Sequence, residues 1–331
     1  MRILGKTDLL VSPVALGSAA FGSALDERTS FALLDAYVAA GGNLIDTARI
    51  YAGGESEAVL GKWLKQARPQ NVIVATKGAH YALGTPTVMR LSREEIESDL
   101  DTSLRVMGVD HIDFYWLHRD DPAREIGEII ETMESLVQAG KIRYYGASNY
   151  RTDRLRAAEA YAAANGIIGF SAVSNQYSVA CLNRGHNTNP DPTIVAVDDE
   201  ALAYHAESGM PLIPFQATAR GYFAKLAAGR EISPALRAAY ENEENGRTYA
   251  GLEALCREKG CSMQTATLVA TAKTPFQTVP ITAVSTVDQM ADVAAAIRLL
   301  IKKSKATVLC EHGRFFHYPT VKTTLPAFSP R

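Results

Sequence analysis

The sequence lacks long apolar runs, an excess of one charge and clustered cysteines, and each absence argues against a class of protein. No stretch approaches the roughly 20 apolar residues that a membrane-spanning helix needs, and the first residues form no apolar secretion signal. The net charge is −2 over 331 residues, without a long run of one sign. Nucleic acid is not an expected partner, because its phosphates require a basic surface. We therefore expect a cytoplasmic protein that binds neither membranes nor nucleic acid.

Cysteine and metal-ligand patterns are also sparse. Among the four cysteines, only Cys256 and Cys261 are close in sequence, and their spacing matches no common zinc or redox motif. Reduced thiols are the default for a cytosolic protein. The run from His118 to Asp121 offers metal ligands, but no second histidine ends another predicted strand. A metal-dependent hydrolase is therefore a distant alternative, and we expect no metal site. No pattern indicates an oligomeric state.

Short apolar segments alternate with segments of helical periodicity along most of the chain. Eight such units in about three hundred residues, without a linker-like change in composition, favour a single (β/α)8 TIM barrel over residues 1–331. A doubly wound dinucleotide fold is the alternative, but no Gly-x-Gly-x-x-Gly opens a helix after a first strand. Residues 1–12 suggest an N-terminal β-hairpin, and residues 302–331 form a tail without a recognisable role. The predicted strands are residues 14–17, 44–46, 72–77, 111–118, 142–148, 170–176, 211–216 and 278–282.

Two stretches break the alternation. Residues 179–197 are rich in Asn, Pro, Gly and Thr, and a long irregular segment inside a domain is often a functional lid. We expect this segment to be mobile and to cover the barrel mouth, because it follows the sixth strand. A second irregular stretch, containing Ser233 and Pro234, precedes a helix predicted near residues 249–259.

Titratable side chains follow three successive strands. Asp46 ends the second predicted strand, Tyr51 lies in the glycine-rich loop after it, Lys77 ends the third strand and His118 the fourth. In a barrel the carboxyl ends of all strands face one mouth, which gathers these four residues. Taken singly, each has a structural explanation: a strand-end cap for Asp46, a packing tyrosine, a capping lysine and a core histidine. Four on neighbouring strand ends are harder to explain that way.

The chemistry of these four side chains is complementary. A phenol is a poor acid near neutral pH unless a cation stabilises its phenolate. Lys77 is such a cation, and the Asp46 carboxylate would keep it charged. His118 adds a neutral donor that could orient a carbonyl oxygen. The group suits protonation of an oxygen that gains charge while its carbon receives hydride.

These residues and their surroundings resemble the aldo-keto reductases over about residues 1–300. Asp46, Tyr51, Lys77 and His118 match the catalytic tetrad of that family in order and local setting. The supporting motifs are Leu4-Gly-Lys-Thr-Asp8, Asn43-Leu-Ile-Asp-Thr-Ala48 with Tyr51, Glu57-x-x-Leu60-Gly61, Ser103-Leu-x-x-Met-Gly-Val-Asp-His-Ile-Asp-Phe-Tyr-Trp-Leu-His118, Gly140-Lys-Ile-Arg143, Gly146-Ala-Ser-Asn149 and Gln176-Tyr-Ser178.

The resemblance implies an NADP(H)-dependent carbonyl reductase or alcohol dehydrogenase acting on an aldehyde, ketone or sugar. Tyr51 would be the proton donor, Lys77 would lower its pKa, Asp46 would hold Lys77, and His118 would orient the small-molecule carbonyl substrate. A regulatory or cofactor-sensing protein on the same barrel is the alternative. The implied cofactor-binding residues are Ser148, Asn149, Gln176, Phe215, Gln216, Arg220, Gly221, Ser285 and Gln289.

The sequence departs from the family pattern where the adenosine end of the cofactor would lie. Residues 283–293 contain no Lys or Arg to pair with a 2′-phosphate, and Val293 stands where the family commonly has an Asn that contacts adenine. Arg220 is the candidate cation from the preceding loop. We therefore expect NADP as cofactor, with NAD a closer competitor than usual. Substrate identity depends on His80-Tyr81, Arg119 and residues 179–197.

Overall fold

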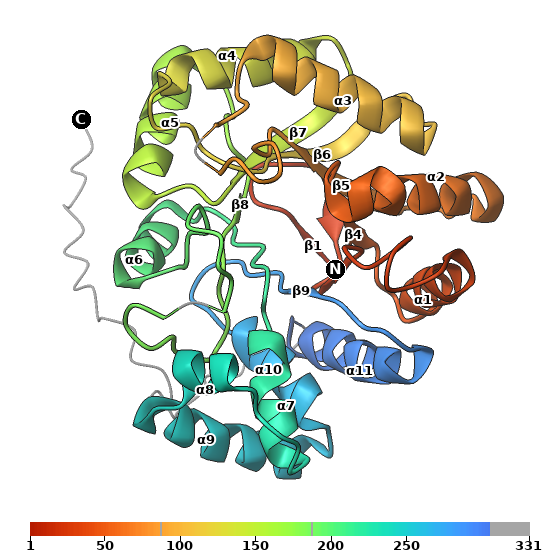
Figure 1. Ribbon diagram of the computed structural model, residues 1–331, viewed down its shortest axis with the longest axis vertical. Helices are drawn as coiled ribbons and strands as arrows, with labels where there is room; N and C mark the ends of the chain where they lie inside the picture. Colours follow the sequence, from red (N-terminus) through yellow and green to blue (C-terminus); the bar gives the residue numbers. More distant parts are fainter. Residues whose placement is uncertain (87, 187, 305–331) are drawn as a thin grey trace, which may run out of the picture.

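A parallel sheet forms the centre of the molecule, and helices surround it (Figure 1). The computed structural model describes residues 1–304 except 87 and 187. Strand order in the sheet is β8-β7-β6-β5-β4-β3-β9, so β3 and β9, which come first and last of these strands in the chain, pair with each other. The strands are β3 (Ala15–Gly17), β4 (Leu44–Asp46), β5 (Ile73–Gly78), β6 (Ile112–Leu117), β7 (Ile142–Ser148), β8 (Val173–Ser174) and β9 (Ile281–Thr282).

The sheet closes through the segment predicted as the seventh of eight strands, residues 211–216. Leu212 forms parallel bridges to Val173 on one side and to Thr278 on the other. The Val173 amide donates to the Pro211 carbonyl at 2.9 Å, and the Leu212 amide donates to Gln277 at 2.9 Å. Residues 211–216 join the neighbouring segments through isolated β-bridges and do not form a continuous β-strand ladder. The predicted (β/α)8 barrel is nonetheless confirmed.

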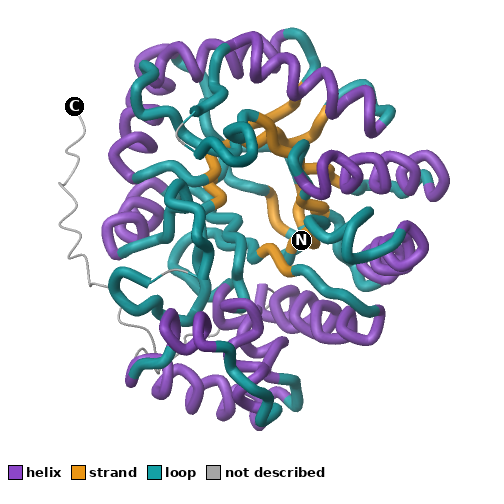
Figure 2. Tube along the Cα trace, in the orientation of Figure 1, coloured by secondary structure: helices purple, strands orange, loops and turns teal. Residues whose placement is uncertain are grey.

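The helices begin and end at residues whose chemistry explains their bounds. The Ser92 hydroxyl and the Glu95 side chain form a capping box at the start of α3, and Gly108 ends the same helix in the left-handed conformation. In Figure 2 the helices form the outer layer around the strands. They are α1 (Glu27–Ala39), η1 (Tyr51–Gly54), α2 (Glu55–Ala67), α3 (Arg93–Met107), α4 (Ile126–Gln138), α5 (Thr152–Asn165), α6 (Asp199–Ser208), η2 (Ala219–Gly221), α7 (Tyr222–Ala227), α8 (Pro234–Tyr240), α9 (Glu243–Lys259), α10 (Met263–Thr271) and α11 (Val287–Ser304).

Two sequence-based expectations for residues 222–259 were wrong. The stretch expected to be irregular contains α7 and α8, and α9 begins six residues earlier than predicted, at Glu243 rather than 249. Ser233 caps α8 by accepting from the Leu236 amide, with Pro234 in the first helical position. Together with α9 and α10 these helices enclose a separate apolar cluster around Phe223 and Tyr240. Figure 1 shows these four helices grouped at the lower end of the view, as a side lobe of the barrel.

The N-terminal hairpin closes one end of the barrel interior, and its strands are β1 (Arg2–Ile3) and β2 (Leu10–Val11). The hairpin predicted for residues 1–12 is therefore confirmed. The Gly5 amide donates to the Gln277 side chain at 3.0 Å, which ties the hairpin to the approach of β9. Buried interior residues are Leu4, Leu9, Val11, Ala15, Leu44, Ile73, Ala75, Phe114, Trp116, Ala172, Ile213, Val279 and Ile281.

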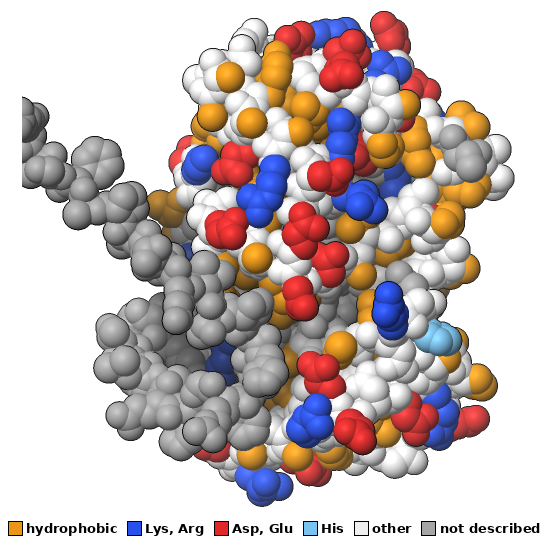
Figure 3. All heavy atoms as spheres, turned by 90° about the vertical axis from the view of Figure 1, so that its left-hand side faces the viewer, with side chains coloured by type: hydrophobic (Ala, Val, Ile, Leu, Met, Phe, Trp, Pro, Cys, Tyr) orange, Lys and Arg blue, Asp and Glu red, His pale blue; other side chains and the backbone are white. Residues whose placement is uncertain are grey.

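The outer surface carries no broad region of one charge on the face shown in Figure 3, where acidic, basic and apolar side chains are intermixed. Within residues 1–304, less 87 and 187, no helix is long and apolar enough to cross a membrane. The tail predicted from residue 302 lies outside the described residues from 305 onward, and residues 302–304 belong to α11.

Candidate active site

A buried ion pair between neighbouring strands forms the base of the site. Asp46 is the last residue of β4, and Lys77 lies near the end of β5. The Lys77 ammonium donates to Asp46 Oδ1 at 2.5 Å and to the Thr47 carbonyl at 2.8 Å. Burial disfavours the ammonium, but the Asp46 carboxylate and the Tyr51 oxygen outweigh burial and raise the pKa of Lys77. The lysine therefore stays protonated at neutral pH.

The loop after β4 folds back over the strand ends and places Tyr51 beside Lys77. The Arg49 amide donates to the Lys77 carbonyl at 2.9 Å, which fixes the loop to β5. Gly54 has φ of +104°, and a Cβ there would lie 2.1 Å from the Arg49 guanidinium, so glycine is required. The Lys77 Nζ lies 5.0 Å from the centroid of the Tyr51 ring.

The pKa of Tyr51 results from opposing influences. Burial raises it and is the largest effect, the Lys77 ammonium is the main lowering influence, and the Asp46 carboxylate raises it again. The net direction is upward from the ordinary value. The predicted lowering by Lys77 is therefore present, but it offsets burial only in part.

His118 follows β6 and faces the phenol. Its ring stands edge-on to Tyr51, with ring centroids 5.9 Å apart, and the His80 ring packs against it at 4.7 Å. Burial, followed by the charges of Arg119 and Lys77, lowers the pKa of His118 well below its ordinary value. The imidazole is therefore neutral at physiological pH. Its Nδ1 is buried and makes no hydrogen bond within the described chain.

Glu57 supports the Tyr51 loop, a role that the sequence analysis did not assign. Its side chain is fully buried on α2. Oε2 accepts from Arg49 Nη1 at 2.7 Å, and Oε1 accepts from Thr76 Oγ1 at 2.6 Å. The carboxylate thus joins the loop to β5 next to Lys77. The sequence signal for this role was a glutamate among the buried, mostly apolar positions of the segment that forms α2.

Two residues at the end of β7 connect His118 with the predicted nicotinamide site. Ser148 Oγ donates to the Ser174 carbonyl at 2.8 Å. Asn149 Nδ2 donates to Ser148 Oγ at 3.1 Å and to the His118 carbonyl at 3.2 Å. Asn149 adopts φ of +60°, which turns the chain at the strand end. Both side chains therefore lie at the barrel mouth, as predicted.

Gln176 offers an amide suited to a polar ligand. The residue is 3% exposed, and neither amide atom makes a hydrogen bond of ordinary geometry within the described chain. Burial raises the pKa of the nearby Tyr240 phenol, and the Thr188 and Gln176 side chains partly offset that rise. Phe215 is partly buried, pairs with Gln176 through a backbone bridge and packs against the barrel interior. A buried amide that lacks a well-formed hydrogen bond among the described residues retains hydrogen-bonding capacity for a ligand.

Gln216, Arg220 and Gly221 lie in the next loop, at positive φ of 54°, 54° and 76°. Gln216 Oε1 accepts from Thr188 Oγ1 at 2.9 Å. Arg220 Nη1 donates to the Thr188 carbonyl, also at 2.9 Å. Arg220 is exposed, and no ion pair involves it among the described residues. Its charge is thus available to an anion.

Ser285 and Gln289 form a separate, exposed pair at the start of α11. The Ser285 amide donates to Gln289 Oε1 at 2.7 Å, and no hydrogen bond joins the pair to the other predicted cofactor residues in the described chain. Val293, one helical turn further, is 1% exposed and packs in the outer core. An apolar residue at this position thus contributes to helix packing.

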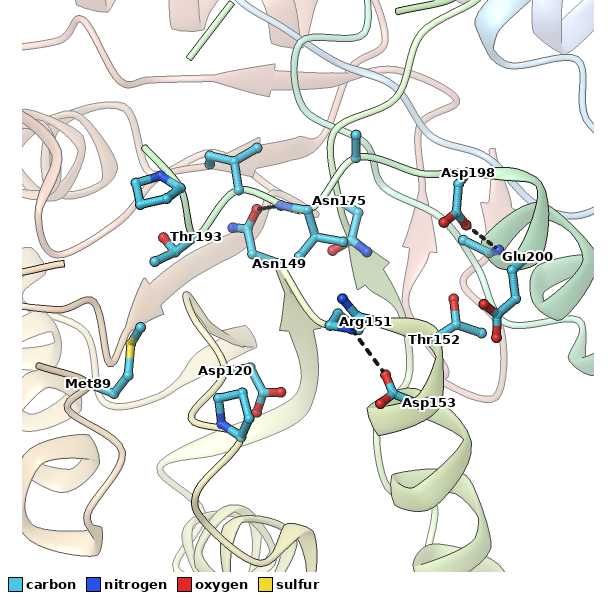
Figure 4. Close-up of a pocket in the computed structure, with 16 residues that line it drawn as sticks. Met89, Asp120, Asn149, Arg151, Thr152, Asp153, Asn175, Thr193, Asp198 and Glu200 are labelled. Carbon is cyan, nitrogen blue, oxygen red and sulfur yellow. Dashed lines mark hydrogen bonds and ion pairs between the residues drawn. The ribbon is translucent and has the colours of Figure 1, made fainter. Parts of the chain in front are cut away.

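Residues 188–197, which we call the mouth strap, contact the strand-end loops on several sides. Thr188 bonds Gln216 and Arg220, Asp191 bonds Arg119, and the Val195 amide donates to Asn149 Oδ1 at 3.2 Å. The strap also lines a cavity of about 530 Å³ that includes Asn149 and Asn175 (Figure 4). None of the four predicted catalytic residues lines this cavity. The segment predicted as a lid is thus irregular but extensively hydrogen-bonded.

Comparisons with known proteins identify relatives of this chain. YrpG, an uncharacterized oxidoreductase of Bacillus subtilis, is 28% identical over 312 residues, 91% of each chain. The putative aryl-alcohol dehydrogenase AAD14 of Saccharomyces cerevisiae is 30% identical and the norsolorinic acid reductase of Aspergillus flavus 26%. These alignments cover 76% and 78% of this chain but 66% of each fungal protein. The model of the Aldo/keto reductase family matches residues 13–312, and the chain belongs to that family.

Proposed function

We propose that the protein reduces an aldehyde, ketone or sugar carbonyl to the alcohol, or catalyses the reverse, with a nicotinamide cofactor and with Tyr51 as proton donor. The observation that carries the proposal is the buried Asp46–Lys77 pair placed against Tyr51 and faced by a neutral His118. Family membership supports carbonyl reduction in general. The assignment of roles to individual residues is our inference from their geometry.

Tyr51 supplies the proton in this scheme. As the carbonyl carbon receives hydride, its oxygen gains negative charge and takes the phenolic proton, which leaves an alcohol and a phenolate. The Lys77 ammonium beside the ring stabilises that phenolate, and Asp46 keeps the ammonium charged and fixed. Preorganised charge of this kind stabilises the transition state more than the ground state.

His118 orients the substrate. A neutral imidazole can donate one hydrogen bond to the carbonyl oxygen without competing with Tyr51 as an acid. Its low pKa, caused mainly by burial, preserves that state across the physiological range. The edge-on packing of His118 against Tyr51 supports this pairing of a hydrogen-bond donor with the acid.

The nicotinamide cofactor, when bound, would supply or accept the hydride. Ser148, Asn149 and Gln176 would hold its carboxamide, and the unpaired Gln176 amide fits that task. The partly buried Phe215 offers an aromatic face for ring stacking, while Gln216, Gly221, Ser285 and Gln289 would contact the remainder. Arg220 is the candidate partner of a 2′-phosphate. We propose NADP as the preferred cofactor and the cytoplasm as the location.

The proposal is tested by nicotinamide oxidation with a panel of aldehydes, ketones, sugars and steroids. Tyr51→Phe should bind cofactor normally and fold as the parent, yet lose at least about a hundredfold in kcat, because only the proton donor is removed. Tyr161→Phe, on the outer helix α5, is the matched control and should behave as the parent. Near-parent rates in Tyr51→Phe would reject Tyr51 as the acid. Cofactor binding without turnover of any carbonyl would instead indicate a cofactor-sensing protein.

A further inference from the structure

Asp191 in the mouth strap connects three segments around the site. One carboxylate oxygen accepts from the Tyr81 phenol at 2.8 Å and from Arg119 Nη2 at 2.7 Å. The other accepts from the Thr193 amide at 2.8 Å and from the Thr193 hydroxyl at 2.6 Å. Although burial opposes it, these donors lower the pKa of Asp191 well below its usual range. The carboxylate is therefore charged at every working pH.

Both partners of Asp191 are next to residues that face the reacting centre. Arg119 is 4% exposed, follows His118 in sequence, and donates from Nη1 to the His118 carbonyl at 2.8 Å. Tyr81 follows His80, whose ring packs on the His118 ring. Arg119 Nε also donates to Thr193 Oγ1 at 2.7 Å. The strap thus contacts both Arg119, which follows His118 in the chain, and Tyr81, which follows the His80 that packs on His118.

We propose that Asp191 is a positioning residue for carbonyl reduction: it fixes Arg119 and Tyr81 beside His118 and neutralises the guanidinium that donates to the His118 carbonyl. This inference rests on the proposed function. Asp191 acts through its partners and is not placed in contact with the substrate.

The electrostatic part of the proposal gives it a signature that simple packing lacks. Lys77, Asp46 and Arg119 are the charged groups acting on Tyr51, and Arg119, Lys77 and His80 act on His118. Arg119 lowers the pKa of both. Without Asp191 the guanidinium would be uncompensated, so the pKa of Tyr51, which burial raises, should be lower than in the parent. Carbonyl reduction requires the protonated phenol, and its rate should then decline at lower pH than in the parent.

The experiment compares kcat, KM and pH profiles of the parent, Asp191→Asn and Glu94→Gln. Asn keeps the shape of Asp but removes its charge, whereas Glu94 is an exposed carboxylate on the outer helix α3, away from the cavity. Asp191→Asn should lose about tenfold or more in kcat, and its alkaline limb should move down by about half a pH unit. Glu94→Gln should overlay the parent. A uniform loss of kcat with an unmoved alkaline limb would overturn the proposal.

Arg119→Gln provides an independent measurement if Asp191→Asn folds poorly. Removing the cation leaves Asp191 unneutralised, so the alkaline limb should move to higher pH, opposite to Asp191→Asn. An unchanged limb in Arg119→Gln would also overturn the proposal. The proposed function is tested separately by the parent and by Tyr51→Phe. If the parent turns over through Tyr51 while Asp191→Asn matches it throughout, this inference alone fails.

Discussion

Replacing Lys77 by methionine would leave Asp46 as a buried carboxylate without its partner. The two side chains are only 3% and 5% exposed, so water cannot take over the role of the ammonium. Asp46 Oδ2 already lacks a hydrogen bond among the described residues. Breaking a buried pair on one side typically costs about 3–5 kcal/mol of unfolding free energy. We expect a loss of that size at neutral pH.

The loss should depend on pH in a defined direction. Burial already raises the pKa of Asp46 above 3.8, and the Lys77 charge opposes this. In Lys77→Met the folded-state pKa rises further, so protonation removes the penalty at acid pH. As pH increases from the unfolded value through the raised folded value, the folded state loses stability relative to the parent. The deficit should therefore be smaller near pH 5 than near pH 8, which urea unfolding at both pH values measures.

A second substitution separates stability from catalysis. In Lys77→Met with Asp46→Asn no buried charge remains, and about 2 kcal/mol or more of the lost stability should return, while activity should stay low. The alkaline limb of Lys77→Met itself should move to higher pH, because the main influence lowering the Tyr51 pKa is gone. A pH-independent stability change below about 1 kcal/mol would refute the burial argument. A pH–rate profile that overlays the parent would show that Lys77 does not tune Tyr51.

Two further predictions concern the cofactor and the strap. A charge-assisted contact contributes about 1.5–3 kcal/mol, so its absence from residues 283–293 should reduce discrimination against NADH by roughly ten- to a hundredfold. Fluorescence titrations of the parent and Arg220→Ala with both cofactors measure this. A preference for NADPH above about a thousandfold in Arg220→Ala would contradict the assigned phosphate site. Proteolysis within residues 179–197 should slow when cofactor and a substrate analogue are added, since bound ligands at the barrel mouth would make opening of this segment rarer still. Cleavage indifferent to both would reject the lid.

Local patterns were sufficient to predict the barrel and the proximity of Asp46, Tyr51, Lys77 and His118 at the strand ends. Apolar strands ending in Asp46, Lys77 and His118 have fixed directions, and parallel pairing necessarily brings neighbouring strand ends together. The register of β4 with β5, which pairs Asp46 with Ala75, places Lys77 two residues beyond that pair. The position of Tyr51 near Lys77 could be predicted because a glycine-rich loop can fold back over the strand end.

Contacts between distant segments could not be derived in this way. Asp191 and Arg119 are 72 residues apart, and an irregular segment has no periodicity that predicts which loop it touches. The sequence-based prediction missed the helices of the side lobe for another reason. α7 is only 6 residues long, too short for a periodic pattern, whereas α8 carried a readable signal in Ser233-Pro234. The start of α9 was signalled too, by Asn242 and the acidic residues after it.

The hairpin that seals the barrel has a consequence for the order of events during synthesis. Gly5 bonds Gln277 across 272 residues of sequence, and β3 pairs with β9. At about 5–20 residues per second, roughly 15–55 s pass between translation of these two partners. Until then the apolar side chains of Leu4, Leu9 and Val11 have no complete interior to enter. The nascent chain therefore exposes this apolar hairpin for most of its translation, and long-range closure is the step at which chaperones would have most effect.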